Sequence, residues 1–471
     1  MSNTTKKEDL DQKLVTEKLG DLIGWLETWR ATNGAYNGFV VHRTETKRMG
    51  SVHDTAWTQS AVVRGYGNLY RKSGEARWYD AMILAADLLA DRYDDNTGRW
   101  HHTGHEDERF QSLVSCALAV CALLGISDIV DDDKRKRYIE ITEDHVRRYW
   151  FDILWVEREG AFKFTEVDFY SPDEDRFVVN FNTMAVEALI AVYDVTGKKE
   201  FVERALLVGE WLLSRWSENL AANKKFLKDK ESVLDNFNSE WMAPGGFSYQ
   251  FSTLCRDPDN YVTLYAGLSL RGIWALYQST GDERYAKLIR AQSEYILAMR
   301  DPQTRLFYHT ARKGRVEKNP QFIAGAGMTL LGLHEVMPLL GNKAVPIDTV
   351  KSILQRQYVN GAFPNFIGKN DTGYKRRDGG GAVWEDVVAS VNWNAQLFEY
   401  LTRLIDDPAE ITIRPCNNVV RIIKPRFFYM DSPLWVFIFS WAPPRSWGAY
   451  FYYKKRSEAY LVVPAKNCNY L

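Results

Sequence analysis

Three segments of the chain repeat one pattern, and this repeat limits the possible folds more than any other feature. Each has an apolar helical stretch ending in Tyr-x-x-[Ser/Thr]-Gly, then a few charged residues and a second, amphipathic stretch, at residues 68–93, 191–216 and 275–300. Glycine readily adopts the left-handed conformation that ends a helix. The pattern therefore predicts helical hairpins with short connections.

A second recurring element connects the hairpins. Six times, a Gly or turn residue precedes an aromatic residue and a short extended run, at residues 33–42, 97–108, 159–170, 244–254, 304–314 and 360–371. A helix that is apolar on nearly all faces follows each run, at residues 55–70, 110–124, 181–193, 262–277, 322–339 and 387–405. A helix with one charged face precedes each run, for example at residues 13–30, 80–93 and 134–150.

The polarity of these helices predicts the architecture. A helix that is apolar all round has to be covered all round, whereas a helix with a charged face can border water. Six covered helices alternating with six striped ones predict an all-α fold, an (α/α)6 barrel with an inner and an outer ring. An open superhelix of hairpins is the alternative, which the long aromatic connections disfavour. We expect residues 1–410 to form the barrel and residues 411–471 a small strand-rich extension.

Composition excludes several classes of protein. Lys and Arg total 60 against 61 Asp and Glu, and 45% of the residues are hydrophobic, which excludes a disordered chain and a basic protein that coats nucleic acid. The aromatic content of 14% is typical of sites that stack ring-shaped ligands. The five cysteines are scattered, the N-terminal segment is polar, and no apolar run reaches the roughly 20 residues of a membrane-spanning helix. We therefore expect a cytoplasmic protein with no transmembrane segment and no cofactor; the sequence leaves the oligomeric state open.

The predicted barrel also indicates where a functional site lies. The N-terminal ends of the inner helices and the aromatic runs open on one face, so polar and aromatic residues far apart in the sequence converge there. Apart from the acidic pairs described next, the residues expected to bind a ligand at this face are Trp57, His105, Arg109, Asn180, Asn182, Trp241, Tyr261, Arg376, Arg377 and Trp384.

Two acidic pairs open inner helices. His53-Asp54 precedes the first inner helix and Glu385-Asp386 the sixth. Such acids either cap the helix or serve as general acids, because an aromatic-walled pocket raises the pKa of a carboxyl group. The first and sixth helices are neighbours in a ring, so Asp54 and one of the two later acids can form the carboxylate pair used in glycoside hydrolysis. We expect these four residues to be catalytic.

Two polar loops accompany these helices. His101, His102 and His105 suggest zinc, but they lie on an extended loop without the i, i+4 spacing of helical zinc motifs, so we expect a substrate-contacting rim and no metal. Arg376 and Arg377 precede three glycines. This basic loop suits bidentate binding of a carboxylate or sulfate, and a surface lid without a ligand is the alternative.

With these features the chain resembles the (α/α)6-barrel carbohydrate-active enzymes, in particular the unsaturated glucuronyl hydrolase and rhamnogalacturonyl hydrolase group. The resemblance spans about residues 13–406 and rests on His53-Asp54 and on the strings at residues 271–277 and 280–285. It implies a glycoside hydrolase-like enzyme for uronate-containing oligo- or polysaccharides, with residues 1–410 as the catalytic domain. The group's second aspartate, a proton donor, corresponds to a position where this chain has Asn180 and Asn182.

This departure opens other reactions, because an amide cannot donate a proton as a carboxylic acid does. Related barrel lyases use an Asn to neutralise a uronate carboxylate and a Tyr or His as base, a role that Tyr261 or His53 can fill. Epimerisation at C5 begins with the same proton abstraction, so a polysaccharide lyase and a C5-epimerase are alternatives on the same substrates. A terpene cyclase or prenyltransferase toroid, whose Asp-rich motif is missing at the expected cavity, and a non-catalytic glycan-binding protein are alternatives of another class.

Overall fold

The computed structural model describes the chain in segments and divides it into two compact units, residues 1–418 and 419–471. The described residues are 10–30, 34–36, 55–101, 111–167, 175–228, 250–252, 260–312, 315–341, 344–368, 389–414, 451–455 and 458–462. In the second unit, strands β11 (Phe451–Lys455) and β12 (Glu458–Val462) pair as an antiparallel hairpin.

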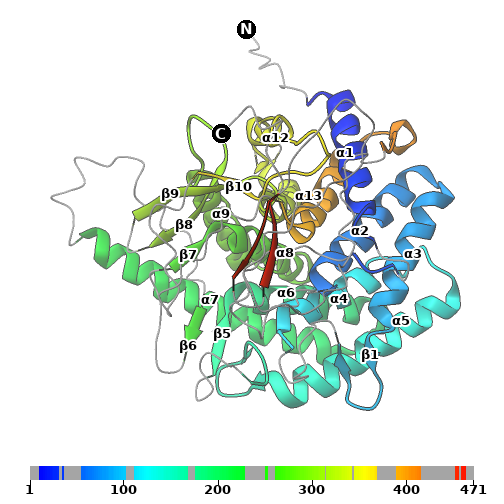
Figure 1. Cartoon of the computed structure of the whole chain (residues 1–471). Helices are drawn as coiled ribbons and strands as arrows, with labels where there is room; N and C mark the ends of the chain where they lie inside the picture. Colours follow the sequence, from blue (N-terminus) through cyan, green and yellow to red (C-terminus); the bar gives the residue numbers. More distant parts are fainter. Residues whose placement is uncertain are drawn as a thin grey trace, which may run out of the picture. The chain divides into compact units, whose positions relative to one another are not determined.

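Six helices of the first unit form a closed inner ring (Figure 1). They are α2 (Thr55–Ser73), α4 (Leu113–Leu124), α6 (Val179–Thr196), α8 (Thr263–Thr280), α10 (Ala326–Glu335) and α13 (Val391–Leu404). Each packs against the next along the chain, and α13 packs against α2. This last contact closes the ring, which confirms the predicted (α/α)6 barrel and excludes the open superhelix.

The outer ring consists of the striped helices that alternate with these along the chain. They are α1 (Gln12–Glu27), α3 (Ala76–Ala90), α5 (Asp132–His145), α7 (Lys199–Lys228), α9 (Glu283–Ala298) and α12 (Ile347–Leu354). The short helix α11 (Met337–Leu340) follows α10, and the 3-10 turn η5 (Pro408–Glu410) follows α13. None of the described helices combines the length and apolarity that crossing a bilayer requires.

Local signals set the helix ends. Asp11, Asp131 and Asp282 accept hydrogen bonds from backbone N–H groups at the starts of α1, α5 and α9, as N-terminal caps do. At the ends of α6 and α8, Gly197 and Gly281 have φ angles of 68° and 67°. These left-handed residues are the glycines of the repeated Tyr-x-x-Thr-Gly turn, so the predicted hairpin turns are present.

One outer helix differs from its prediction. The sequence pattern predicts a single amphipathic helix over residues 134–150, but α5 ends at His145 and continues as the π-helix η1 (Val146–Leu154). The wider turn places residues five apart on one face. The indole Nε1 of Trp150 therefore donates to Nε2 of His145 at 3.0 Å, and Tyr149, Trp150 and Leu154 are all buried.

Short strands occur in the aromatic connections. Two-residue hairpins pair β1 (Tyr93–Asp94) with β2 (Arg99–Trp100) and β3 (Trp155–Val156) with β4 (Ala161–Phe162), and β5 (Arg176–Val178) pairs with β6 (Gln250–Ser252). A larger antiparallel sheet has the order β10 (Phe366–Ile367), β9 (Arg315–Phe322), β8 (Phe307–Arg312), β7 (Asn260–Val262). It connects the segments that directly precede α8, α10 and α13.

Polar contacts follow the seam where the first inner helix meets the last. From one end to the other, Gln396 donates to the Trp57 carbonyl at 2.9 Å, Arg64 pairs with Glu399, and Asn68 donates to Thr402 at 3.0 Å. Both helices run in the same direction, since the partner numbers increase together. These contacts join helices that are more than 300 residues apart in sequence.

The C-terminal end of α13 is capped from the same seam. The ammonium group of Lys72 donates to the carbonyls of Thr402, Arg403 and Ile405 at 3.1, 3.1 and 2.5 Å. A cation at this position satisfies carbonyls that have no partner within the helix and complements the helix dipole. Lys72 therefore stabilises the last turn of α13.

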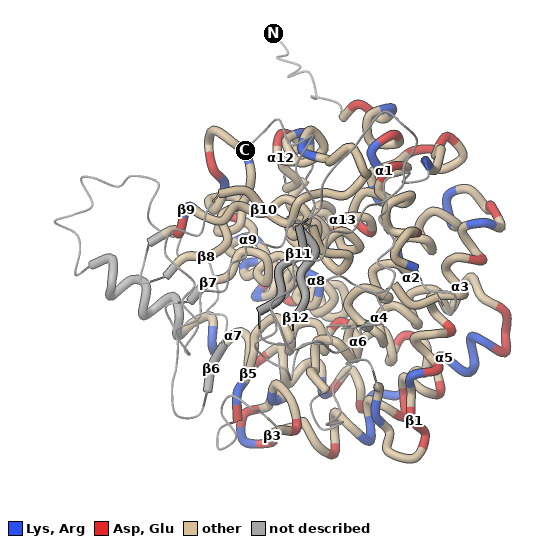
Figure 2. Tube along the Cα trace, viewed as in Figure 1, with Lys and Arg blue, Asp and Glu red and all other residues tan. Residues whose placement is uncertain are grey.

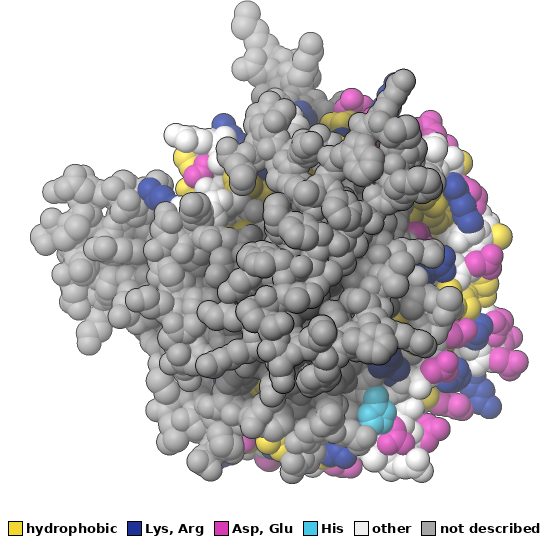
Figure 3. All heavy atoms as spheres, viewed as in Figure 1, with side chains coloured by type: hydrophobic (Ala, Val, Ile, Leu, Met, Phe, Trp, Pro, Cys, Tyr) yellow, Lys and Arg dark blue, Asp and Glu magenta, His cyan; other side chains and the backbone are white. Residues whose placement is uncertain are grey.

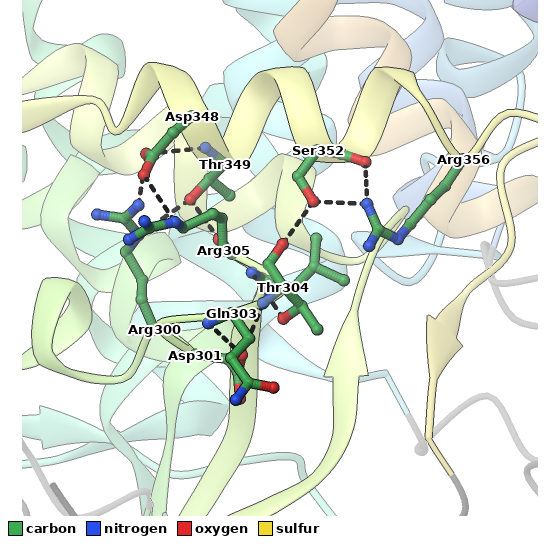
Figure 4. Close-up of polar contacts among 10 residues, drawn as sticks. Arg300, Asp301, Gln303, Thr304, Arg305, Asp348, Thr349, Ser352 and Arg356 are labelled. Atoms are coloured by element: carbon green, nitrogen blue, oxygen red, sulfur yellow. Dashed lines mark hydrogen bonds and ion pairs between the residues drawn. The ribbon is translucent and has the colours of Figure 1, made fainter.

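A polar network fixes outer helix α12 to the turn between α9 and β8 (Figure 4). Arg300 donates to Thr349 at 3.0 Å and pairs with Asp348, while Ser352 donates to the Thr304 carbonyl at 2.6 Å. Arg356 in turn donates to the Ser352 carbonyl at 2.6 Å. The network therefore ties α12 to the turn that leads into β8.

Charged residues gather on the outer ring. In Figure 2 the acidic and basic positions lie mainly along the outer helices and their turns, and the inner helices are largely uncharged. On the face drawn in Figure 3, both signs are interleaved over the described surface near α3 and α5, where Lys134 pairs with Asp87 at 2.6 Å and Arg137 with Asp91 at 2.7 Å. Among the described residues of this surface, acidic and basic side chains therefore alternate.

Candidate functional site

The N-terminal ends of the inner helices, together with the aromatic connections beside them, form what we call the mouth of the barrel. Amide side chains at these helix ends hold the connections in place. Gln59 on α2 accepts from the backbone N–H of Tyr36 at 3.2 Å and donates to the Gly34 carbonyl at 3.0 Å. At the start of the second inner helix, the Gln111 side chain accepts from the backbone N–H of Trp100 at 2.9 Å. The amide clamps hold the aromatic runs in place through their backbone.

Asn394 makes the same clamp at the last inner helix. Its Oδ1 accepts from the N–H of Phe363 at 2.8 Å, and its Nδ2 donates to the carbonyls of Phe363 and Ser390, both at 2.9 Å. The Asn394 side chain is fully buried. Both the oxygen and the nitrogen of its amide group therefore bond within the fold.

Asn182, which the sequence places at the substrate site, is the equivalent clamp at α6. Its Oδ1 accepts from the N–H of Phe162 at 2.9 Å, and its Nδ2 donates to the carbonyls of Phe162 and Val178 at 2.9 and 3.1 Å. The side chain is 0% exposed. Asn182 is thus a residue of the fold, and it does not enter the site proposed below.

Asn180 behaves in the opposite way, although it lies only two residues earlier. Its side chain is 1% exposed, yet neither Oδ1 nor Nδ2 has a hydrogen-bond partner. A buried amide without partners costs free energy, and native proteins usually satisfy such a group with water or a ligand. Asn180 is therefore the described side chain of the predicted set that is best suited to receive a ligand.

The two predicted aromatic residues that the structure describes differ in exposure. Trp57 is half-buried near the start of α2. Tyr261 on β7 is buried, with its ring 6.1 Å from that of Tyr295 and its carbonyl accepting from Thr310 at 2.8 Å. Trp57 therefore keeps part of its side chain exposed, whereas the ring of Tyr261 packs against Tyr295 of α9.

The remaining predicted site residues lie outside the described residues. They are His53, Asp54, His105, Arg109, Trp241, Arg376, Arg377, Trp384, Glu385 and Asp386. Of the three loop histidines only His101 is described, and its Nε2 lies 3.6 Å from a carboxylate oxygen of Asp94.

An aromatic group that is not among the site residues expected from the sequence lies at the starts of α10 and α13. The ring centroids of His309 and Phe322 are 5.0 Å apart, those of Phe322 and Trp393 are 5.2 Å apart, and those of Phe366 and Trp393 are 6.1 Å apart. His309, Phe366 and Trp393 are half-buried. We call these four residues the rim cluster. The available signal was the histidine inside the aromatic run at residues 304–314.

The rim cluster has a polar neighbour. Asn392 precedes Trp393 on α13, and its Oδ1 is buried without a hydrogen-bond partner. Half-buried aromatic faces beside unpaired amide groups are the usual components of sites that bind sugars, because the rings cover the apolar face of the sugar and the amides bind its hydroxyl groups. The described part of the mouth therefore combines aromatic rings with unpaired amide atoms, which suits a ligand that has both an apolar face and hydroxyl groups.

Comparison with protein families gives one match. The sequence model of the N-acylglucosamine 2-epimerase (GlcNAc 2-epimerase) family matches residues 38–253, which is less than half of the chain. The matched span contains α2, α4 and α6, and with them Trp57, Asn180 and Asn182. A comparison with curated protein sequences finds no match.

Several solved structures share the fold. A D-mannose isomerase aligns with a TM-score of 0.56 at 12% identity, covering 83% of this chain and 98% of that one. A cellobiose 2-epimerase from Bacillus thermoamylovorans aligns with a TM-score of 0.57 at 12% identity, covering 83% and 100%. An unsaturated glucuronyl hydrolase specific for heparin aligns with a TM-score of 0.55 at 12% identity, covering 83% and 96%.

These findings agree on the general class. The predicted resemblance to (α/α)6-barrel carbohydrate-active enzymes is confirmed, and the family match together with the neighbouring enzymes supports an enzyme that acts on carbohydrates.

Proposed function

We propose that the chain is a sugar epimerase or isomerase whose active site is the mouth of the barrel. The observation that carries the proposal is the match of residues 38–253 to the N-acylglucosamine 2-epimerase family. The sequence alone favours hydrolysis and keeps epimerisation as an alternative, whereas the family match favours epimerisation. The likeness to a D-mannose isomerase and a cellobiose 2-epimerase also favours epimerisation or isomerisation over hydrolysis.

The reaction needs few groups. Inversion or isomerisation next to a sugar carbonyl requires a base that removes a proton from carbon, an acid that returns one, and donors that hold the oxygen on which charge develops. An imidazole suits the proton steps because its ordinary pKa lies near neutral pH. We assign these steps to His53, the expected residue at the start of the first inner helix, and to His309 of the rim cluster.

Binding is assigned to the other groups at the mouth. The unpaired amide of Asn180 binds a sugar oxygen, and the half-buried rings of Trp57 and Trp393 stack on the apolar face of the sugar. Asp54, Glu385 and Asp386 remain proposed acid or base groups, and His105, Arg109, Trp241 and Trp384 proposed rim contacts. A cytoplasmic location remains an expectation from the sequence.

A uronate-directed reaction is the second candidate. It is favoured by the likeness to the unsaturated glucuronyl hydrolase and by the basic Arg376-Arg377 loop, which would bind the carboxylate. It predicts that acidic oligosaccharides are cleaved, with residues 1–410 as the catalytic domain in either case.

One panel separates the candidates. The protein is incubated with N-acylglucosamine, D-mannose, cellobiose and a set of unsaturated and saturated uronate oligosaccharides, and the products are identified by chromatography and ultraviolet absorbance. Formation of an epimer or ketose without new reducing ends supports the proposal. A fall in the absorbance of unsaturated uronates indicates the hydrolase, a rise indicates a lyase, and either result without any epimer overturns the proposal.

A further inference from the structure

A layer of buried charge crosses the inside of the barrel and is not used by the site at the mouth. Arg64 on α2 pairs with Glu399 on α13 at 2.8 Å, and Arg271 on α8 pairs with Glu187 on α6. The side chains of Arg64, Arg271 and Glu399 are 8%, 8% and 1% exposed. Ion pairs this deeply buried are uncommon because desolvation of the charges is costly.

The four residues lie at one depth. Glu187, Arg271 and Glu399 each come eight residues after the first residue of their helix, and Arg64 comes nine after the first residue of α2. At 1.5 Å per residue, the layer lies about 12 Å below the start of the inner helices. We call these four residues the charge layer.

The charges of the layer, which are buried between inner helices, also act on one another. Burial alone lowers the pKa of Arg271, but nearby Glu187 and Glu399 raise it above the ordinary value. Because α10 lies between α8 and α13 in the ring, Glu399 influences Arg271 across that ring. The thiol of Cys121 on α4 interacts with all four residues, and burial raises its pKa, so it is neutral and adds no charge.

Three polar atoms of the layer are buried without a hydrogen bond: Nε and Nη1 of Arg64 and Oε2 of Glu187. Nε of Arg64 lies 2.8 Å from Oε1 of Glu399 in the ion pair, so Nη1 of Arg64 and Oε2 of Glu187 are the two atoms considered for a ligand. The rest of the Glu187 side chain keeps 21% exposure, so solvent reaches the layer. The charges of Arg64 and Glu187 are already balanced by their ion-pair partners. Their unpaired donor and acceptor therefore suit a hydroxyl group, which both donates and accepts, better than they suit an ion.

We propose that the charge layer is the floor of a sugar-binding site that extends inward from the mouth, where Nη1 of Arg64 donates to, and Oε2 of Glu187 accepts from, hydroxyl groups on the innermost ring of a neutral sugar. The proposal rests on the proposed function and adds which residues read the hydroxyl pattern. Two arginines and two glutamates leave no net charge, so a carboxylate finds no free cation in the layer.

The test combines protein variants with deoxy sugars. Binding of each panel sugar and of analogues lacking one hydroxyl is measured by calorimetry or NMR with the full chain, for wild type, Glu187→Gln and Arg64→Lys. Arg64→Lys keeps a cation for Glu399 but removes the unpaired Nη1, so it serves where loss of the Glu187 charge unfolds the protein. Glu210→Gln is the control, because Glu210 forms an ion pair with Arg284 in which both side chains are 55% exposed.

The outcomes are distinct. In wild type, removal of one particular hydroxyl is expected to weaken binding about tenfold, and in at least one floor variant that penalty should disappear. Equal penalties in wild type and both floor variants, or no binding of any panel sugar, overturn the proposal. If wild type forms epimers but loss of a hydroxyl weakens binding equally in wild type and in both floor variants, the floor assignment fails and the proposed function stands. If this loss of affinity differs between wild type and a floor variant but no epimer forms, the floor assignment stands and the proposed function fails.

Discussion

The imidazole of His145 lies between two fixed partners: its Nδ1 is 2.8 Å from the carbonyl oxygen of Gly98, and its Nε2 accepts from the indole of Trp150 at 3.0 Å. Gly98 belongs to the turn between β1 and β2, and Trp150 to the π-helix η1. This arrangement requires the neutral imidazole, since the nitrogen that accepts from Trp150 cannot carry a proton.

Acid is therefore expected to weaken the fold through His145. Burial lowers its pKa to about 4, and an unfolded histidine titrates near 6.5. Between these values the unfolded chain binds the additional proton, so the free energy of unfolding falls as the pH is lowered through this window, by about 3 kcal/mol at most. Urea unfolding of wild type and His145→Gln at a series of pH values measures it: the variant should lose this part of the pH dependence, and equal slopes would show that His145 does not titrate in this way.

Two asparagines two residues apart are expected to respond oppositely to the same change. Asn182→Leu removes the hydrogen bonds to the N–H and carbonyl of Phe162 and to the carbonyl of Val178, which costs about 2–4 kcal/mol of unfolding free energy. Asn180→Leu removes an amide that has no partner, so stability should be unchanged or higher. Chemical denaturation gives both values, and a larger loss for Asn180→Leu would contradict the roles assigned here.

Close packing of two inner helices is expected to depend on Gly272. A Cβ at this position would lie 1.8 Å from the carbonyl oxygen of Thr183, so Gly272→Ala forces α8 away from α6 and should cost about 1–3 kcal/mol or more. Gly281 is the control, because a Cβ there meets nothing within 4 Å and only its φ of 67° opposes alanine, at about 1–2 kcal/mol. Thermal unfolding compares them: Gly272→Ala should lose more stability than Gly281→Ala, and a smaller loss at Gly272 is the contrary result.

Trp393 is expected to contribute to sugar binding. Trp393→Leu removes a half-buried ring of the rim cluster and should weaken binding of the preferred sugar about tenfold, since one aromatic contact contributes about 1 kcal/mol or more. Trp274→Leu is the matched control, because Trp274 is also half-buried on an inner helix but lies beside Tyr277, towards the other end of α8. Titration by intrinsic fluorescence or calorimetry measures both, and the same affinity in both variants would remove Trp393 from the site.

The repeated patterns explain why the barrel is predictable from sequence. Apolar helices with no charged face have to be inside, and the Tyr-x-x-[Ser/Thr]-Gly turns require the glycine conformation seen at Gly197 and Gly281. The π-helix η1 is not predictable in this way, because a periodicity of 3.6 residues does not contain the five-residue spacing that joins His145 and Trp150.

The site was less predictable because residue type alone does not reveal hydrogen-bond partners. Asn180 and Asn182 look equivalent in the sequence, but the backbone of Phe162 uses one and leaves the other unpaired. His309 lies within the aromatic run at residues 304–314, but the run alone does not place it at the mouth, since its position beside Phe322 and Trp393 depends on the pairing of β8 with β9. The charge layer likewise arises only when helices distant in sequence close into a ring.

The most direct test of the account follows solvent deuterium. The protein is incubated in D2O with N-acylglucosamine, D-mannose or cellobiose, and NMR monitors the carbon next to the sugar carbonyl. The account predicts that deuterium appears at this carbon in product, and that Asn180→Leu slows its incorporation while the protein stays folded. Turnover of a sugar with no deuterium at this position, or with new reducing ends in its place, would contradict it.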